Sequence, residues 1–167
     1  MKRFCKALFL SLLMLVSIHA LADNVTEGNR LYRAKQYEEA MSFFMKLDAQ
    51  KSPEIMNRIG FMYDAGRGVE RNGNIAFQWY RKAAETGLAK AQYNLGLCFQ
   101  NGIGVKKDIN EAIKWYLKAA EQGYPDAESK MGYLTVTGKG VKQDFKQAMQ
   151  WYRRAVEHGN IHAIPEL

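Results

Sequence analysis

The sequence contains little proline and little cysteine, and each shortage restricts the architecture. Only 3 of its 167 residues are proline, which disfavours extended linkers and favours uninterrupted helices. The 2 cysteines are Cys5 and Cys98. Because Cys5 lies in a segment that we expect to be removed, Cys98 would remain alone, and an internal disulfide is excluded. We expect Cys98 to be a small buried residue, with a reactive or intermolecular thiol as the alternative.

Long hydrophobic runs are also scarce. The apolar run 8–18 has 11 residues, fewer than the roughly 20 that a membrane-spanning helix needs. Three basic side chains precede it, and Ala20-Leu21-Ala22 supplies a small-x-small cleavage site after it. This pattern predicts a signal peptide over 1–22 with cleavage after Ala22, and a periplasmic or secreted mature chain. An uncleaved membrane anchor is the alternative.

The excess of positive charge is modest. The formal net charge is +7, but three of the positive residues lie in the first six and would leave with the signal peptide: Lys2, Arg3 and Lys6. A mildly basic, exported chain is a poor candidate for nucleic-acid binding, and we expect no nucleic-acid partner. With 47% hydrophobic and 25% charged residues, the composition is that of a globular domain.

A 36-residue period governs most of the chain. Gly60, Gly96 and Gly132 are spaced by this interval, and so are the Trp-Tyr pairs that begin at residues 79, 115 and 151. The register continues without insertion or deletion through alanine, valine and further glycine positions. It divides the chain into three repeats: 53–88, 89–124 and 125–160.

Each repeat is predicted to form two helices. In the second helix Ala76, Trp79, Tyr80 and Ala83 fall on one apolar face, and we expect the tryptophans to be core residues. A glycine in the middle of a helix costs about 1 kcal/mol of stability relative to alanine. Its presence in each first helix therefore indicates that a neighbouring helix approaches too closely for a Cβ. Helix starts are predicted at Asn72, Asp108 and Asp144, the last two within capping boxes, and left-handed helix ends at Gly87, Gly123 and Gly159.

The segments that flank the repeats differ from them. Residues 23–52 contain a degenerate helix pair with the spacing of a tetratricopeptide repeat. Residues 161–167 are predicted to be a stub against the last helix pair. Because Ile161, Ile164 and Leu167 leave this edge apolar, self-association through the C-terminal edge is an alternative to a folded-back stub.

The repeated pattern resembles the Sel-one-like repeat family, a relative of the tetratricopeptide repeat. It is carried by Ala-Gln-Tyr-Asn-Leu-Gly at 91–96, Gly-Ile-Gly-Val at 102–105, and the Asp108 to Gly123 helix, each with counterparts in the other repeats. The resemblance covers 53–160 fully and 23–52 loosely; Thr135, where the other repeats have Tyr63 and Phe99, departs from it. It implies an all-α fold, an α/α superhelical solenoid, that acts as an adaptor for proteins or peptides.

Catalytic patterns are absent from the sequence. The Gly-x-Gly sequences at 66, 102 and 138 are preceded by helical segments, so we interpret them as turns between helices and not as phosphate loops. His158 and His162 are spaced for one helix, but Gly159 interrupts them, and we expect a solvent-exposed His158 and no metal. Lys82, Lys118 and Arg154, each three residues before a glutamate, predict a ladder of ion pairs on a solvated face. We expect no cofactor.

Two functions remain open. The first is an exported, non-catalytic adaptor that binds a protein or peptide partner through the concave face of the solenoid. The alternative is a cell-wall-directed hydrolase, or a β-lactam- or peptidoglycan-binding protein of the envelope, a role suggested by exported members of the family. No assignable nucleophile or paired acid and base supports the alternative.

Partner recognition is predicted on the first helix of each pair, which lines the concave face in related superhelices. Positions around the mid-helix glycines differ between repeats while the scaffold stays constant, as expected of a surface selected for one partner. The tetratricopeptide-like segment would extend the row with Asn29, Tyr32 and Arg33. As the alternative, Phe61, Leu97 and Tyr133 pack between repeats. The candidate residues are Asn57, Phe61, Asp64, Tyr93, Leu97, Gln100, Ser129 and Tyr133.

Overall fold

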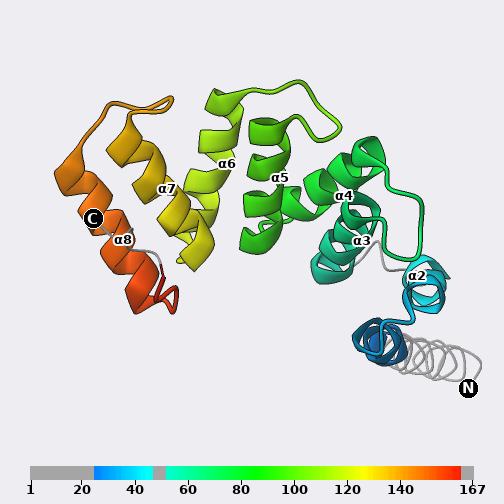
Figure 1. Ribbon diagram of the computed structural model, residues 1–167. Coiled ribbons are helices and arrows are strands. Elements are labelled where there is room, and N and C mark those ends of the chain that lie inside the picture. The colour runs from blue at the N-terminus through cyan, green and yellow to red at the C-terminus, as the bar shows by residue number, and fades with distance from the viewer. Residues whose placement is uncertain (1–24, 47–51, 163–167) are drawn as a thin grey trace, which may run out of the picture.

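The computed structural model describes residues 25–46 and 52–162, which contain helices and no strands (Figure 1). Residues 25–33 are helical. The labelled helices are α2 (Tyr37–Lys46), α3 (Pro53–Ala65), α4 (Gly73–Glu85), α5 (Ala89–Asn101), α6 (Ile109–Glu121), α7 (Pro125–Thr137) and α8 (Phe145–Glu157). The predicted signal peptide and residues 163–167 of the predicted stub lie outside the described part of the chain.

The helices form a solenoid in which each element packs mainly on its neighbours along the chain. The pairs α3–α4, α5–α6 and α7–α8 are in extensive contact, and α4–α5 and α6–α7 join one pair to the next. Figure 1 shows them side by side along an arc from the N-terminal to the C-terminal end. The first helices α3 and α5 also touch directly. The prediction of an all-α solenoid is therefore confirmed.

Side chains that the sequence marks as caps begin the second helix of each pair. Asn72 accepts a hydrogen bond from the Ile75 backbone N–H, and Asp144 accepts one from Gln147. Asp108 caps α6 in the same way, but the expected return contact of the capping box is replaced, because the Glu111 carboxylate pairs with Lys114 instead. The first helices end at glycines with a left-handed backbone: Gly66, Gly102 and Gly138.

The close approach predicted at the mid-helix glycines is present in every repeat. A Cβ placed on Gly96 would lie 2.5 Å from Cε1 of Tyr116, whose ring is fully buried between α5 and α6. The equivalent contacts join Gly60 to Tyr80 and Gly132 to Tyr152. The glycine thus gives the tyrosine ring the space in which to pack, which offsets its weak helix propensity.

The tryptophans do not occupy the position expected of them. It is the tyrosine of each Trp-Tyr pair that fills the core, whereas Trp115 and Trp151 are half-buried. Trp115 packs on the buried cluster of α4 and α5, and Trp151 on that of α6 and α7. Adjacent residues on a helix point about 100° apart, so only one member of the pair can face its own partner helix, and the tryptophan instead seals the junction with the preceding pair.

The expected ladder of lysine–glutamate pairs is also wrong. The Lys118 ammonium lies 4.1 Å from the centroid of the Trp115 ring, and the Lys82 ammonium lies 4.9 Å from that of Trp79. Arg154 likewise covers the Trp151 ring. A cation at i+3 on the exposed edge of a tryptophan gains a cation–π contact and shields the ring from water.

An ionic cluster that the sequence did not indicate ties α7 to α8. The fully buried Glu128 carboxylate lies 2.9 Å from Nη2 of Arg154 and 2.8 Å from Nδ1 of His158. Arg154 also donates a hydrogen bond of 2.9 Å to the carbonyl of Ala120 at the end of α6. His158 is exposed to solvent, as expected, and its ring is at the same time a partner of the buried carboxylate.

Within the described residues, no helix has the length and apolar character that crossing a membrane requires. Cys98 is fully buried in the cluster of α4 and α5, as expected. Burial, followed by the Asp64 carboxylate, raises the pKa of its thiol to about 12. The thiol is therefore protonated and unreactive at neutral pH.

Candidate binding pocket on the first helices

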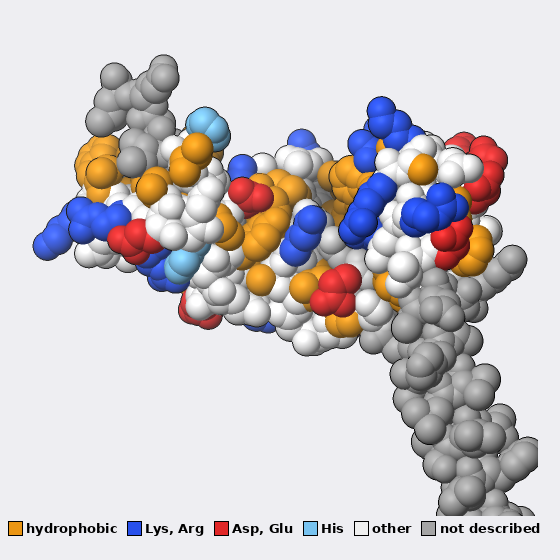
Figure 2. All heavy atoms as spheres, turned by 90° about the horizontal axis from the view of Figure 1, so that it is seen from below, with side chains coloured by type: hydrophobic (Ala, Val, Ile, Leu, Met, Phe, Trp, Pro, Cys, Tyr) orange, Lys and Arg blue, Asp and Glu red, His pale blue; other side chains and the backbone are white. Residues whose placement is uncertain are grey.

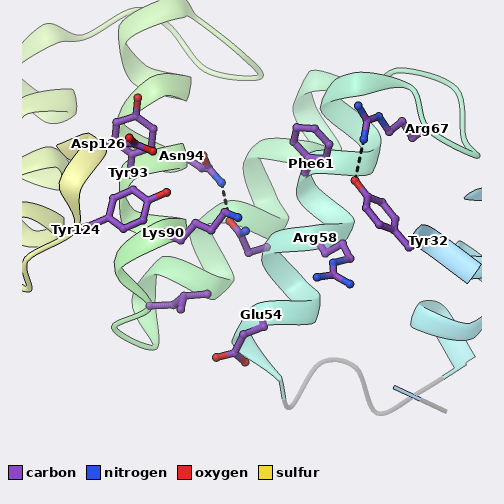
Figure 3. Close-up of a pocket in the computed structure, with 12 residues that line it drawn as sticks. Tyr32, Glu54, Arg58, Phe61, Arg67, Lys90, Tyr93, Asn94, Tyr124 and Asp126 are labelled. Atoms are coloured by element: carbon purple, nitrogen blue, oxygen red, sulfur yellow. Dashed lines mark hydrogen bonds between the residues drawn. The ribbon is translucent and has the colours of Figure 1, made fainter. Parts of the chain in front are cut away.

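A pocket of about 580 Å³ lies between the helical residues 25–33, α3, α5 and the beginning of α7 (Figure 3). It is built mainly from the first helices of the three pairs. Figure 2, a view from below Figure 1, shows apolar side chains over the middle of the molecule and Lys and Arg side chains between them and the N-terminal end.

The N-terminal wall of the pocket consists of aromatic rings and guanidinium groups. Tyr32 accepts a hydrogen bond of 3.0 Å from Nη1 of Arg67, drawn as a dashed line in Figure 3. The Arg58 guanidinium lies 5.1 Å from the centroid of the Tyr32 ring, and Arg67 lies 4.9 Å from that of Phe61. Burial lowers the pKa of Arg58, but an arginine stays charged at neutral pH. The wall therefore presents two positive charges held on aromatic faces.

Side-chain amides line the middle of the pocket. Nδ2 of Asn94 on α5 donates a hydrogen bond of 2.8 Å to Oδ1 of Asn57 on α3. Within the described residues this leaves both amide N–H groups of Asn57, one N–H group of Asn94 and the amide oxygen of Asn94 without a hydrogen bond. An amide donor and an amide acceptor side by side match the hydrogen-bonding groups of an extended peptide backbone.

The opposite wall is made of tyrosines beside one carboxylate. The ring centroids of Tyr93 and Tyr124 are 5.5 Å apart. Burial, then the charge of Asp126, raises the pKa of Tyr124 to about 12, and the same two causes raise the pKa of Tyr93. Both phenols are therefore neutral at physiological pH and can offer their rings and O–H groups to a ligand. Lys90 completes this side of the pocket.

This arrangement has the groups needed for recognition. Rings, amides and charges of both signs provide shape, hydrogen bonds and orientation for a ligand. Among the described residues, no three His, Cys, Asp or Glu side chains converge as metal ligands would.

Comparison with known families assigns the repeats. The family model of the Sel1 repeat matches residues 53–88, 89–124 and 125–160, which is more than half of the chain. The chain belongs to the Sel1 repeat family. A sel1-like repeat-containing protein of Acanthamoeba polyphaga mimivirus is 51% identical over 39 residues, 23% of this chain and 7% of that protein.

Solved structures agree with the Sel1 repeat solenoid. A Sel1 repeat protein from Oxalobacter formigenes is 61% identical, with a TM-score of 0.81, over 83% of this chain and 57% of that one. The protective antigen c5321 of uropathogenic Escherichia coli is 35% identical, with a TM-score of 0.79, over 86% and 32% of the two chains. Cysteine-rich protein B of Helicobacter pylori is 28% identical, with a TM-score of 0.59, over 81% and 93%. The present chain thus spans little more than half the length of the Oxalobacter formigenes protein and about a third of the length of c5321.

Three of the residues predicted from the sequence line the pocket, namely Asn57, Phe61 and Tyr93, and Tyr32 of the extended row joins them. Leu97 lies elsewhere, half-buried against the cluster of α6 and α7. Asp64 and Gln100 have partners within the Sel1 repeats: an Asp64 oxygen is 3.8 Å from Nη2 of Arg71, and Gln100 accepts a hydrogen bond from the Tyr116 hydroxyl.

The two remaining candidates lie on α7 outside the pocket. Ser129 is half-buried. Tyr133 is exposed, and its hydroxyl accepts a hydrogen bond of 2.9 Å from the Lys139 ammonium, which lowers the pKa of the phenol. Lys130 also approaches the ring. The candidate residues therefore form a pocket group and a separate α7 group, and the role of each in binding stays a prediction.

Several pocket residues were not among the candidates, although the Sel1 register contained a signal for them. Glu54, Lys90 and Asp126 are spaced by 36 residues, occupy equivalent positions near the start of the first helices, and all line the pocket. Leu88 and Tyr124 form a second equivalent set, and Arg58 with Asn94 a third. A search by equivalent position, and not only by distance from the mid-helix glycine, would have found them.

Proposed function

We propose that this protein is an exported, non-catalytic adaptor that binds a protein or peptide partner through its first helices. Solenoids of Sel1 repeats are typical of protein–protein interaction scaffolds. Repeats that each offer a few side chains to one extended surface suit a ligand longer than a small molecule.

The observation that carries the proposal is the pocket itself. Equivalent positions of consecutive repeats converge on one cavity, and they differ in chemistry where the scaffold positions stay constant: Glu54, Lys90 and Asp126 at one level, Arg58 and Asn94 at another. Side chains that vary around a common hollow give specificity without disturbing the packing beneath.

A cross-linking experiment in the native envelope fraction tests this function. We expect the double variant Phe61→Ala, Asn94→Ala to lose the partners that the wild type captures, at an unchanged melting temperature. Ile75→Ala on α4 is the matched control, since Ile75 and Phe61 have the same exposed fraction, 37%. Partners retained by the double variant would contradict the proposed site.

Export is the second part of the proposal. It rests on the basic, apolar and small-residue segments at the start of the sequence. We expect N-terminal sequencing of protein from the periplasmic fraction or the medium to begin at Asp23. A cytoplasmic product that begins at Met1 would contradict it. Incubating the same preparation with β-lactams or peptidoglycan fragments tests the alternative of a hydrolase, for which we expect no turnover.

Self-association through the C-terminal edge is the third part. On α8, Phe145 and Met149 are 64% and 50% exposed, whereas Phe77, the equivalent of Met149 on α4, is 7% exposed. On α4 the next helix pair of the solenoid covers this apolar face. A second copy of the chain offers the surface most similar to such a pair, and it would cover the face on α8. We expect the protein to dimerise with rising concentration in light scattering and Met149→Glu to remain monomeric; a wild-type monomer throughout would contradict it.

A further inference from the structure

Arg58 and Arg67 of the pocket differ from the basic side chains of the molecule that pair with a carboxylate. In the described part of the chain, neither Arg58 nor Arg67 forms an ion pair with a carboxylate, although both are half-buried. The basic side chains that do pair with a carboxylate are Arg30, Arg71, Arg81, Lys114 and Arg154, and His158 joins them at Glu128. Charges withdrawn from water without a counterion are costly, which favours an anion from outside the described residues.

Neutral groups hold both guanidiniums in place. Arg58 donates to Oδ1 of Asn29 and lies over the Tyr32 ring, while Arg67 donates to the Tyr32 hydroxyl. Arg67 also lies 4.9 Å from the Phe61 ring centroid. Each guanidinium carries five N–H donors, so one protein hydrogen bond leaves most of them available. Tyr32 contacts both arginines and is their shared support.

The rest of the pocket indicates what accompanies the anion. Across from the arginines stand the rings of Tyr93 and Tyr124 (Figure 3), and the Asn57–Asn94 amide pair lies in the middle of the pocket. On that side Asp126 adds a negative charge and the exposed Lys90 a positive one, and Glu54 adds a second exposed carboxylate to the pocket. A polyanionic ligand would be repelled by the carboxylate of Asp126. A peptide with one acidic side chain beside apolar ones would instead place the apolar side chains against the tyrosine rings and its backbone against the amides. Because Arg58 and Arg67 are half-buried while Lys90 is exposed to solvent, charge complementarity favours the N-terminal wall as the place of the anion.

We propose that the pocket selects an extended polypeptide segment by one acidic side chain. The carboxylate is bound by Arg58 and Arg67, and a neighbouring aromatic or aliphatic side chain lies against Tyr93 and Tyr124. This inference rests on the proposed adaptor function and names the ligand class for the same site. Tyr32 is a positioning residue, so the helical segment 25–33 is part of the recognition surface and not only a cover for repeat 1.

A peptide library tests the ligand class directly. Protein produced from the full-length sequence is immobilised and offered capped, random dodecapeptides, and the retained peptides are sequenced by mass spectrometry. We expect enrichment of Asp or Glu next to aromatic or aliphatic residues. Enrichment without acidic residues would overturn the inference and leave the adaptor function standing. Retention of nothing by the wild type would overturn both.

Affinities of one retained peptide and of its Glu→Gln or Asp→Asn counterpart then locate the contact. Loss of a charge-assisted hydrogen bond predicts a weakening of about tenfold to a hundredfold for Arg67→Gln. The same substitution should change little for the peptide that already lacks the carboxylate. Arg81→Gln on α4 is the control, because it removes the same charge from an exposed ion pair. Equal losses for both peptides, or for both variants, would overturn the proposal.

Two milder variants separate positioning from folding. Tyr32→Phe keeps the ring under Arg58 but removes the acceptor for Arg67, so we expect severalfold weaker binding at an unchanged melting temperature. Arg67→Lys keeps the charge without the planar fork and should bind between wild type and Arg67→Gln. If inorganic phosphate displaced the peptide at concentrations that chloride tolerates, the pocket would be a phosphate site and the assignment to an acidic peptide would be wrong.

Discussion

Repeats 2 and 3 place different chemistry at the same point of the solenoid. Gln92 and Glu128 are equivalent residues of α5 and α7, and both are buried. Gln92 accepts a hydrogen bond of 2.7 Å from Gln122, whereas Glu128 contacts His158, which is the equivalent of Gln122. An amide pair in one repeat is thus replaced by a contact between a carboxylate and an imidazole in the next, within the same backbone arrangement.

Two backbone carbonyls at equivalent positions of the repeats also accept hydrogen bonds from different side chains. In repeat 2 the Gln92 amide approaches the carbonyl of Ala84 at 3.4 Å, and at the next junction Arg154 donates to the carbonyl of Ala120 at 2.9 Å. Repeat 1 places the apolar Met56 at the position of Gln92. The comparison shows that the register fixes the backbone, while each interior position accepts any side chain whose polar groups find a partner.

We expect the largest change in the free energy of unfolding from truncating a core tyrosine, and we expect it to be larger in repeat 2 than in repeat 3. Tyr116 is fully buried with helices on both sides, and we expect Tyr116→Ala to cost about 3–5 kcal/mol. Tyr152 lies in α8, the last described helix, so Tyr152→Ala should cost less because its surroundings can relax. Urea unfolding followed by circular dichroism measures both. A larger loss for Tyr152→Ala would contradict the comparison.

A substitution that makes repeat 3 resemble repeat 2 should have the next largest effect. Glu128→Gln removes the carboxylate from Arg154 and His158, and a lost hydrogen bond to a charged group predicts about 1.5–3 kcal/mol. Adding His158→Gln recreates the Gln92–Gln122 pair, and we expect part of that loss to be regained. Glu121→Gln, in an exposed position of α6, serves as the control. Additive losses in the double variant would show that the two positions are not coupled.

A smaller effect should distinguish the mid-helix glycines. A Cβ on Gly96 would press on the enclosed Tyr116 ring at 2.5 Å, and one on Gly132 would lie 2.8 Å from Tyr152. Overpacking costs about 1–3 kcal/mol, whereas the better helix propensity of alanine contributes about 1 kcal/mol. We therefore expect Gly96→Ala to lower the free energy of unfolding. Gly132→Ala should be closer to neutral in the same unfolding assay. Stabilisation by Gly96→Ala would show that the ring moves freely.

The smallest perturbation uses the wild-type thiol as a reporter of repeat 2. Burial raises the pKa of Cys98 from about 9 to about 12, so folding stabilises the protonated thiol. This contribution is present below pH 9 and is lost as the pH rises through about 12. At pH 8 we expect a thiol reagent to label Cys98 only when repeat 2 opens. Rapid labelling of the folded protein would mean that this core is accessible.

The sequence determined the fold because helix pairs that repeat without interruption can bury their apolar faces only against their neighbours. It also indicated the close helix approach at Gly96 and the buried Cys98, since both follow from one residue and its helical surroundings. The same reasoning selected Asn57, Phe61 and Tyr93, which line the pocket, and their role in binding stays a prediction. What these predictions share is that the period alone specifies them.

The tertiary structure decided which side chains meet. The choice of Tyr116 over Trp115 as the core ring depends on how α6 is rotated about its axis, which the apolar spacing leaves open. The contact of Glu128 with His158, and that of Tyr32 with Arg67, join residues 30 and 35 positions apart. Such contacts depend on rotations and offsets between helices that the interior packing sets jointly, so no local pattern encodes them.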